Sequence, residues 1–161
     1  MRRTLIITTA VLTAAAVAVP VAGAPAKAGK AAKVRCTLQL TAQGPPAGTP
    51  PVGVSFGLVQ CDSPFGKGVH RGSAVVTPTR PGNGTIAVRF KNYYDRGTIS
   101  GRIAGTFSAT SSTNITYTGT VTFTAGTGAF KRVRGRGTIK CTTADAGVHK
   151  ACTVTSKLTG T

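Results

Sequence analysis

The sequence predicts an all-β fold, a single antiparallel β-barrel of about eight strands held by disulfides, and three observations support this prediction. Apolar and polar residues alternate along much of the chain after residue 28, and no stretch there repeats apolar residues at helical spacing over three turns. Gly- and Pro-containing turns recur about every 8–12 residues, the spacing of short strands in sandwiches and barrels. Glycines at Gly101, Gly105 and Gly119, inside expected strands, suit the tight curvature of a small closed barrel.

The expected strands follow from this alternation. They cover, approximately, residues 34–42, 52–61, 69–77, 85–93, 98–109, 114–124, 138–142 and 152–158. The sixth alternates most clearly, with Thr on one face and apolar side chains on the other: Ile115, Tyr117, Val121 and Phe123.

The second strand carries apolar side chains of one parity, which we expect to face the core: Val52, Val54, Phe56 and Leu58. Cys61 falls on the opposite parity. A β-bulge near Val59 and Gln60 would reconcile the two, because a bulge adds one residue to one strand of a pair.

The N-terminal segment predicts export. A basic region at residues 1–3 precedes a nearly unbroken apolar run at residues 4–19, which Pro20 interrupts. Small residues at Ala26 and Ala28 fit a cleavage site. The run is shorter than the roughly 20 apolar residues of a membrane-spanning helix. We therefore expect a protein that is secreted to the extracellular space or the cell envelope.

Three segments are expected from these signals. They are a cleaved signal peptide at residues 1–28, a disordered leader at residues 29–33 and a single barrel domain at residues 34–161. Cleavage after Ala22 and an uncleaved anchor are the alternatives for the first segment.

Four cysteines, Cys36, Cys61, Cys141 and Cys152, all follow the expected signal peptide. An even count in an exported chain predicts two disulfides, and three pairings are possible. Cys36–Cys61 and Cys141–Cys152 form the shortest loops, each spanning one expected hairpin, and are favoured. Each would stabilise the fold by roughly 3 kcal/mol on the chain-entropy estimate. Metal ligands usually stand in close spacing, and neither CxxC nor HxxxH occurs, so no metal site is expected.

The chain is strongly basic. It has 20 Lys and Arg against 3 acidic residues, all Asp, and a formal net charge of +17. Such a protein attracts polyanions and repels its own copies. Candidate partners of an exported protein are anionic polymers, membrane surfaces and nucleic acid bound without sequence readout, since aromatic stacking residues are few. The alternative is that the charge serves solubility alone.

One local cluster of cations stands out and is the expected anion-binding site: Lys131, Arg132, Arg134, Arg136 and Lys140. On an extended backbone Arg132, Arg134 and Arg136 share one face, so that their guanidinium groups can address successive anionic groups of a polymer. The alternative is that these are ordinary outward-facing residues of a barrel strand.

Two segments resemble a known family. Residues 94–101 (YDRGTISG) look like the turn and strand that lead into the barrel of allene oxide cyclases. Residues 122–130 (TFTAGTGAF), followed by Arg134 and Gly135, are similar to the GGTG-x-F…RG signature shared by allene oxide cyclases and dirigent proteins. The resemblance covers about residues 85–160. It implies an antiparallel barrel whose lumen can hold a hydrophobic ligand, often in a homo-oligomer.

No catalytic residue and no cofactor are expected. Cyclisation in the family's barrels relies on polar and acidic groups in the lumen, and the three Asp here fall in expected loops. Asp145 and His149 lie near one expected hairpin tip, where Ser63 or Ser156 could in principle supply a nucleophile. We expect instead a solvated Asp and a surface His at that tip. His70 is expected at a strand edge.

The leading functional hypothesis is therefore a non-enzymatic exported protein whose basic surface associates with anionic envelope or extracellular polymers. The alternative is a carrier of a lipophilic small ligand, or a cyclase-like enzyme, that uses the barrel lumen. Salt separates the two hypotheses, because binding through Lys and Arg weakens with ionic strength and lumen binding of a neutral ligand does not.

Overall fold

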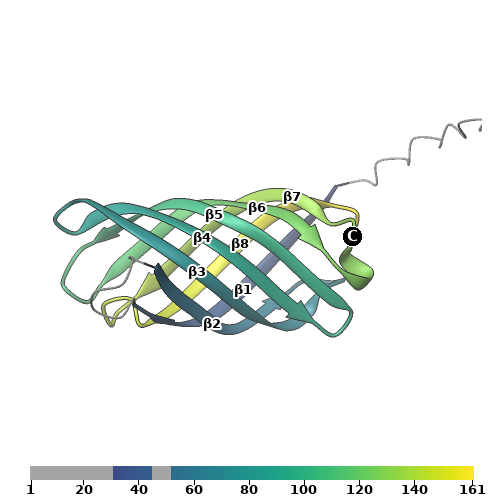
Figure 1. Cartoon of the computed structure of the whole chain (residues 1–161), viewed down its shortest axis with the longest axis horizontal. Coiled ribbons are helices and arrows are strands. Elements are labelled where there is room, and N and C mark those ends of the chain that lie inside the picture. Colours follow the sequence, from purple (N-terminus) through teal and green to yellow (C-terminus); the bar gives the residue numbers. More distant parts are fainter. Residues whose placement is uncertain (1–30, 45–51) are drawn as a thin grey trace, which may run out of the picture.

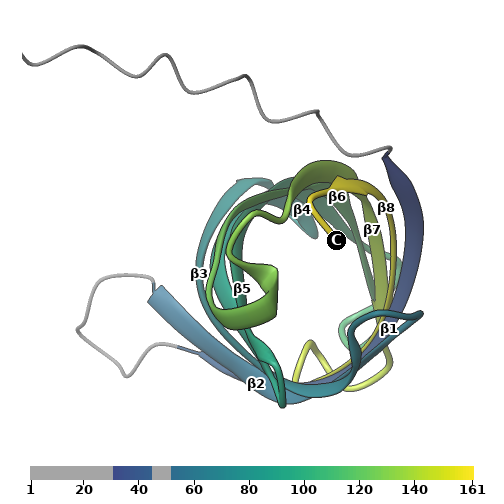
Figure 2. The ribbon, with the colours of Figure 1, turned by 90° about the vertical axis from the view of Figure 1, so that its right-hand side faces the viewer.

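The computed structural model describes residues 31–44 and 52–161, which form a closed barrel of eight antiparallel strands (Figures 1 and 2). Each strand pairs with its neighbours in sequence, and β1 closes the barrel against β8. The predicted fold class is confirmed. The elements are β1 (Ala32–Gln43), β2 (Val52–Cys61), β3 (Gly66–Arg80), β4 (Asn83–Tyr94), β5 (Gly97–Ala109), β6 (Ile115–Gly126), the 3-10 turn η1 (Gly128–Phe130), β7 (Arg134–Thr143) and β8 (His149–Thr159).

Several segments of the sequence prediction lie outside the described residues. They are the signal peptide, the first two residues of the leader and most of the Pro-rich loop before β2. β1 begins at Ala32, so Ala32 and Lys33, assigned to the leader, pair instead with Leu158 and Lys157 of β8. In the described part of the chain no helix is long and apolar enough to cross a membrane.

Both favoured disulfides are confirmed. Cys36 lies directly opposite Cys61 on the β1–β2 pair, and Cys141 lies directly opposite Cys152 on the β7–β8 pair. All four sulfurs belong to buried residues of the barrel interior. Two disulfides are compatible with an extracellular or envelope location.

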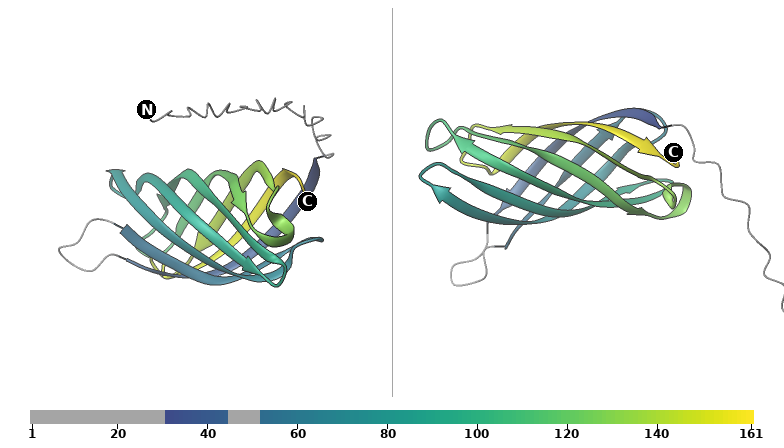
Figure 3. Two further views of the ribbon diagram at one scale, coloured as in Figure 1. Left: turned by 45° about the vertical axis from the view of Figure 1, so that its right-hand side comes forward. Right: turned by 90° about the horizontal axis from the view of Figure 1, so that it is seen from above.

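One end of the barrel is filled by aromatic side chains. Phe65 from the β2–β3 turn, Tyr94 at the end of β4 and Phe130 of η1 pack with ring centroids 5.0 to 6.0 Å apart. Phe130 and the neighbouring Val133 are almost fully buried. Figure 2 looks into this end and shows η1 turned inward at one side of the rim, and Figure 3 shows η1 and the C-terminus at the same end. This cluster, Phe65, Tyr94 and Phe130, is called the aromatic plug below.

The prediction for the faces of β2 was wrong. The β1–β2 register runs without a break from Cys36–Cys61 to Gln43–Val54, so the expected bulge does not occur. Cys61 must face inward to reach Cys36, and the alternation of a strand then fixes every other residue. The side chains expected inside therefore lie on the outer surface, with exposed fractions from 42% to 67%: Val52, Val54, Phe56 and Leu58.

β3 and β7 are longer than predicted, because their glycines looked like turn signals. A Cβ at Gly68 would collide with the carbonyl of Tyr93, and one at Gly137 would collide with the carbonyl of Thr155. These glycines permit close approach of neighbouring strands in a tightly curved barrel. In β5 and β6 the predicted faces are correct, and Ile99, Val121 and Phe123 are buried.

Candidate functional site in the barrel lumen

The barrel encloses a cavity of about 510 Å³. It extends from beneath the aromatic plug towards the opposite end, where the β3–β4 and β7–β8 hairpins border it. Its volume falls within the range of small-molecule sites, about 300–1,000 Å³. Most of its lining is apolar and comes from strands all around the barrel: Leu38, Leu40, Ile86, Val88, Ile103, Val121, Phe123 and Val154.

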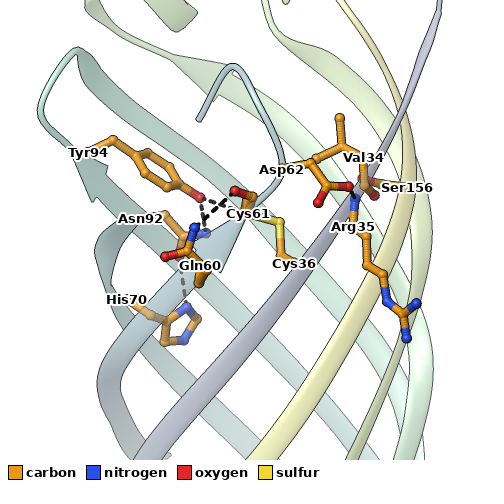
Figure 4. Close-up of a disulfide and its surroundings, with 10 residues drawn as sticks. All are labelled: Val34, Arg35, Cys36, Gln60, Cys61, Asp62, His70, Asn92, Tyr94 and Ser156. Carbon is orange, nitrogen blue, oxygen red and sulfur yellow. Dashed lines mark hydrogen bonds between the residues drawn. A yellow bond between two sulfur atoms is a disulfide. The ribbon is translucent and has the colours of Figure 1, made fainter. Parts of the chain in front are cut away.

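A chain of hydrogen-bonded side chains runs from the wall of this cavity, at Ser55, His70 and Asn92, to Tyr94 of the aromatic plug. His70 of β3 bonds through Nδ1 to Asn92 Oδ1 of β4 at 2.9 Å, and its Nε2 lies 3.4 Å from Ser55 Oγ of β2. Asn92 Nδ2 donates to the hydroxyl of Tyr94 at 3.3 Å, and that hydroxyl donates to Cys61 Sγ at 3.4 Å. Figure 4 shows His70, Asn92 and Tyr94 in line beside the Cys36–Cys61 disulfide. The set from Ser55 to Tyr94 is called the lumen polar chain below.

The direction of these bonds fixes the tautomer of His70. Asn92 uses its amide hydrogen towards Tyr94, so it presents only an accepting oxygen to His70. Nδ1 of His70 must then carry the hydrogen, and Nε2 is left as a lone-pair acceptor facing Ser55. Burial lowers the pKa of His70, an effect that the bond to Asn92 partly opposes, so the imidazole is neutral near pH 7.

The neighbours of His70 hold it in place. The ring stacks on Phe90 at a centroid distance of 5.9 Å and an interplanar angle of 24°. Gly72, opposite Ser55 in the β2–β3 register, leaves the room in which the hydroxyl and the imidazole meet. A Cβ at Gly72 would lie 2.8 Å from Ser55 Oγ and 3.0 Å from His70 Nε2. Ser55 of β2 and His70 of β3 can therefore meet because Gly72 of β3 has no side chain.

Lys150 marks the other end of the cavity. In the described part of the chain it is the one Lys or Arg that lines the lumen. Its Nζ lies 5.0 Å from the centre of the Tyr117 ring, within cation–π distance. Burial lowers the pKa of Lys150, while the charge of Asp145 opposes the shift. A ligand in the lumen thus meets a neutral acceptor at one end and an ammonium group at the other.

Sequence reasoning missed these lumen residues. His70, expected at a strand edge, is 3% exposed, which corrects that expectation. Ser55 faces inward because it lies on the same face of β2 as Cys61. The apolar residues on the opposite face of β2 led to the wrong prediction of which face is buried. Asn92 and His70 are paired by the β3–β4 register, which the sequence pattern does not define.

The hairpin tip at Asp145 and His149 is the solvated turn that the sequence predicts. His149 Nδ1 lies 2.6 Å from Asp145 Oδ2, and the His149 side chain is 71% exposed. The hydroxyl of Thr143 and the backbone N–H of His149 also bond the carboxylate, and these contacts lower the pKa of Asp145. Ser156 does not join this pair, because it is buried and donates to the carbonyl of Val34. Ser63 lies in the β2–β3 turn, at the other end of the barrel.

The predicted anion-binding residues do not form one stripe. Arg136 and Lys140 point outward from β7, whereas Lys131 and Arg132 lie in the turn before it. The guanidinium of Arg134 donates to the backbone carbonyls of Val133 at 2.7 Å and Lys131 at 3.3 Å. It is therefore partly engaged in holding its own turn.

The barrel register instead aligns cations from different strands. Arg136 lies opposite Lys157 of β8, which lies opposite Lys33 of β1. On the other side Arg136 faces Thr122 of β6, which pairs with Arg102 of β5. All four cations are exposed, and like charges directly opposite one another on a sheet are destabilising. Among the described residues no Lys or Arg lies within ion-pair distance of a carboxylate. Arg102, Arg136, Lys157 and Lys33 are called the cation row below.

No group of three or more His, Cys, Asp or Glu side chains comes together within residues 31–44 and 52–161 in a way that could hold a metal ion.

Comparison with known proteins does not assign the chain to a family. No family model matches the chain, and no curated protein matches it. A solved structure of a pyocyanin demethylase is similar over 76% of this chain and 98% of its own, with 17% sequence identity and a TM-score of 0.39. This likeness concerns the barrel fold alone. The resemblance to allene oxide cyclases and dirigent proteins stays a prediction.

Proposed function

We propose that the barrel binds a lipophilic small molecule in its lumen and acts as a carrier for it. The observation that carries the proposal is a cavity of about 510 Å³ with apolar walls and the lumen polar chain set into them. Burial of apolar ligand surface supplies the affinity, and a few placed polar groups fix the orientation.

The polar groups define the ligand further. Because the Ser55 hydroxyl donates to Nε2 of His70, its oxygen is left as an acceptor in the lumen and suits a hydroxyl or N–H group of the ligand. Lys150 at the far end suits an acceptor or an acidic group. A ligand that matches both ends is a lipophilic molecule with a hydrogen-bond donor and an acceptor or acid at opposite ends.

A neutral fluorescent probe with an N–H group, N-phenyl-1-naphthylamine, tests lumen binding. Val88 lines the cavity, whereas the adjacent Ala87 has the outward parity of β4. Val88→Phe fills part of the lumen and should weaken probe binding by about tenfold or more, equivalent to about 1.4 kcal/mol. Ala87→Phe adds the same ring on the outside and should leave the affinity unchanged. Equal affinities of the two variants would place the probe outside the lumen.

A second candidate function is association with an anionic polymer. The cation row supports it, because the row assembles Arg and Lys from four strands on one surface without paired carboxylates. An anionic chain lying along the row would relieve the repulsion among these groups. Arg132 and Lys140 extend the positive surface near the row, and Arg134 is expected to contribute less.

The salt dependence of polyphosphate binding tests this second function. Removal of three row charges in the Arg136→Ala/Lys157→Ala/Lys33→Ala variant should flatten the slope of log affinity against log salt by roughly 2–3 units, at about 0.7–0.9 for each phosphate that is no longer neutralised. The matched control removes three exposed cations that have no cation opposite them on a neighbouring strand: Lys67 and Arg80 of β3 and Arg96 of the β4–β5 turn. If the control flattens the slope as much as the row variant, net charge and not the row explains the binding.

A further inference from the structure

We propose that Ser55 is a nucleophile that accepts an acyl group from lipophilic esters in the lumen, with His70 as its base and Asn92 as the group that orients the base. This activity rests on the proposed lumen binding and extends it to one class of reactive ligand, because the lumen must admit such esters. Carrier function, in contrast, requires binding alone.

The geometry supports it. A hydroxyl, an imidazole and an orienting oxygen stand in sequence, with 3.4 Å from Ser55 Oγ to His70 Nε2 and 2.9 Å from His70 Nδ1 to Asn92 Oδ1. This is the arrangement of an activated nucleophile, in which the first contact is often long before substrate binds. All three residues are buried and all three line the cavity, so an ester in the lumen is within reach of Ser55.

His70 has the protonation state that a general base for Ser55 requires. Asn92 holds a hydrogen on Nδ1 of His70 and leaves the Nε2 lone pair for the proton of Ser55. Because burial lowers the pKa of His70, the base is free at neutral pH. The titratable side chains on neighbouring elements are Tyr94, which acts through Asn92, and Lys150, which lines the same cavity.

The surrounding structure holds the three groups rigidly. Ser55, His70 and Asn92 lie on three consecutive strands of a closed barrel. Tyr94 holds the amide of Asn92, and a sulfur of the Cys36–Cys61 disulfide accepts the Tyr94 hydroxyl. A histidine kept in one tautomer by such a chain is a better base than one that samples both.

The reaction balances without a cofactor. Ser55 Oγ forms a bond to the ester carbonyl carbon, and the bond from that carbon to the alkoxy oxygen breaks. The Ser55 proton passes to His70 Nε2 and then to the departing oxygen, which leaves as an alcohol. Water can then attack the acyl carbon while His70 Nε2 takes its proton. The bond from that carbon to Ser55 Oγ breaks, His70 passes the proton to Oγ, and the acid is released with Ser55 restored.

We expect the first step to be much easier to observe than turnover. β2 pairs with β1 and β3 along both edges, so its backbone N–H groups are used in hydrogen bonds between strands. They are therefore not free to donate to the oxyanion that forms when Ser55 attacks an ester. Loss of one oxyanion donor costs an enzyme about 10²–10³-fold in kcat. Acylation of one site per barrel is therefore the quantity to measure.

The experiment treats the disulfide-bonded protein with p-nitrophenyl octanoate and maps the acyl group by peptide mass spectrometry. One octanoyl group should appear on Ser55, and Ser55→Ala should abolish it. His70→Gln should slow acylation by about 10²-fold or more, the usual contribution of a general base. Ser156→Ala, which removes another buried serine of the interior, should leave acylation unchanged. The rate should also fall at acid pH, with a midpoint below the ordinary value of about 6.5 for His.

Probe binding separates failure of this proposal from failure of the proposed function. If Ser55→Ala and the parent protein bind N-phenyl-1-naphthylamine equally but the parent acquires no acyl group on Ser55, the nucleophile is ruled out and lumen binding stands. Acylation of Lys150 in place of Ser55, or equal rates in His70→Gln, would also overturn the proposal. If neither protein binds the probe, the lumen function itself fails.

Discussion

His70 is the residue on which the chemistry of the lumen depends. It is almost fully buried, it is held in one tautomer by Asn92, and it directs a lone pair towards Ser55 and the cavity. A buried neutral imidazole also links folding to pH. Burial lowers the pKa of His70 in the folded state, so the unfolded chain takes up this proton at a higher pH than the folded one.

The stability contribution of neutral His70 should therefore be fully present above about pH 6.5, the unperturbed value, and should be lost as the pH falls towards the lower pKa of the folded state. We expect the free energy of unfolding of the parent protein to drop more between pH 7.5 and pH 5 than that of His70→Gln. Urea denaturation at the two pH values measures this. His149→Gln is the control, because it removes a histidine but retains the buried imidazole. An equal drop in the parent protein and in His70→Gln would contradict the effect of burial on His70.

At the scale of the element, β2 shows how a covalent link overrides hydrophobic pattern. Four of its apolar residues lie on one face of the strand. Because the disulfide holds Cys61 inside the barrel, that face points outward. Leu58 pairs with Val69 of β3, which pairs with Tyr93 of β4, and all three side chains are exposed. The result is an apolar stripe on the outside and space for Ser55 inside.

Substitutions at two adjacent positions test this assignment. Leu58, 67% exposed, should tolerate Ser with a change in the free energy of unfolding of under about 1 kcal/mol. Val59 is 1% exposed, and Val59→Ser should cost more than about 2 kcal/mol, because it loses buried apolar surface and buries a hydroxyl. Chemical denaturation of both variants measures the difference, and the opposite order would show that the bulged register is the correct one.

The sequence was sufficient for features that depend on local pattern. Alternation in residues 114–124 predicted the faces of β6, and loop length predicted both disulfides. The lumen polar chain was not predictable, because His70, Asn92 and Ser55 meet only through the registers of β2, β3 and β4. The cation row was missed for the same reason, since Lys33 and Arg136 are brought close by barrel closure and not by the sequence between them.

At the scale of the whole molecule, the barrel separates two kinds of surface. The inside is apolar, with the lumen polar chain and one ammonium group from Lys150. The outside carries the cation row in a chain of formal net charge +17. Salt should screen the outer surface and leave the desolvated interior almost unaffected. Binding to the two surfaces can therefore be measured separately in one protein.

Nitrogen NMR of histidine-labelled protein tests the central claim most directly, because the chain has 2 histidines and only His70 faces the lumen. In the free protein His70 should show a protonated Nδ1 and an unprotonated Nε2. Addition of N-phenyl-1-naphthylamine should shift the Nε2 signal of His70, leave that of His149 in place, and do so equally at about 50 and 200 mM salt. A His70 signal that does not respond to the probe, or a response that disappears as the salt rises, would contradict binding in the lumen.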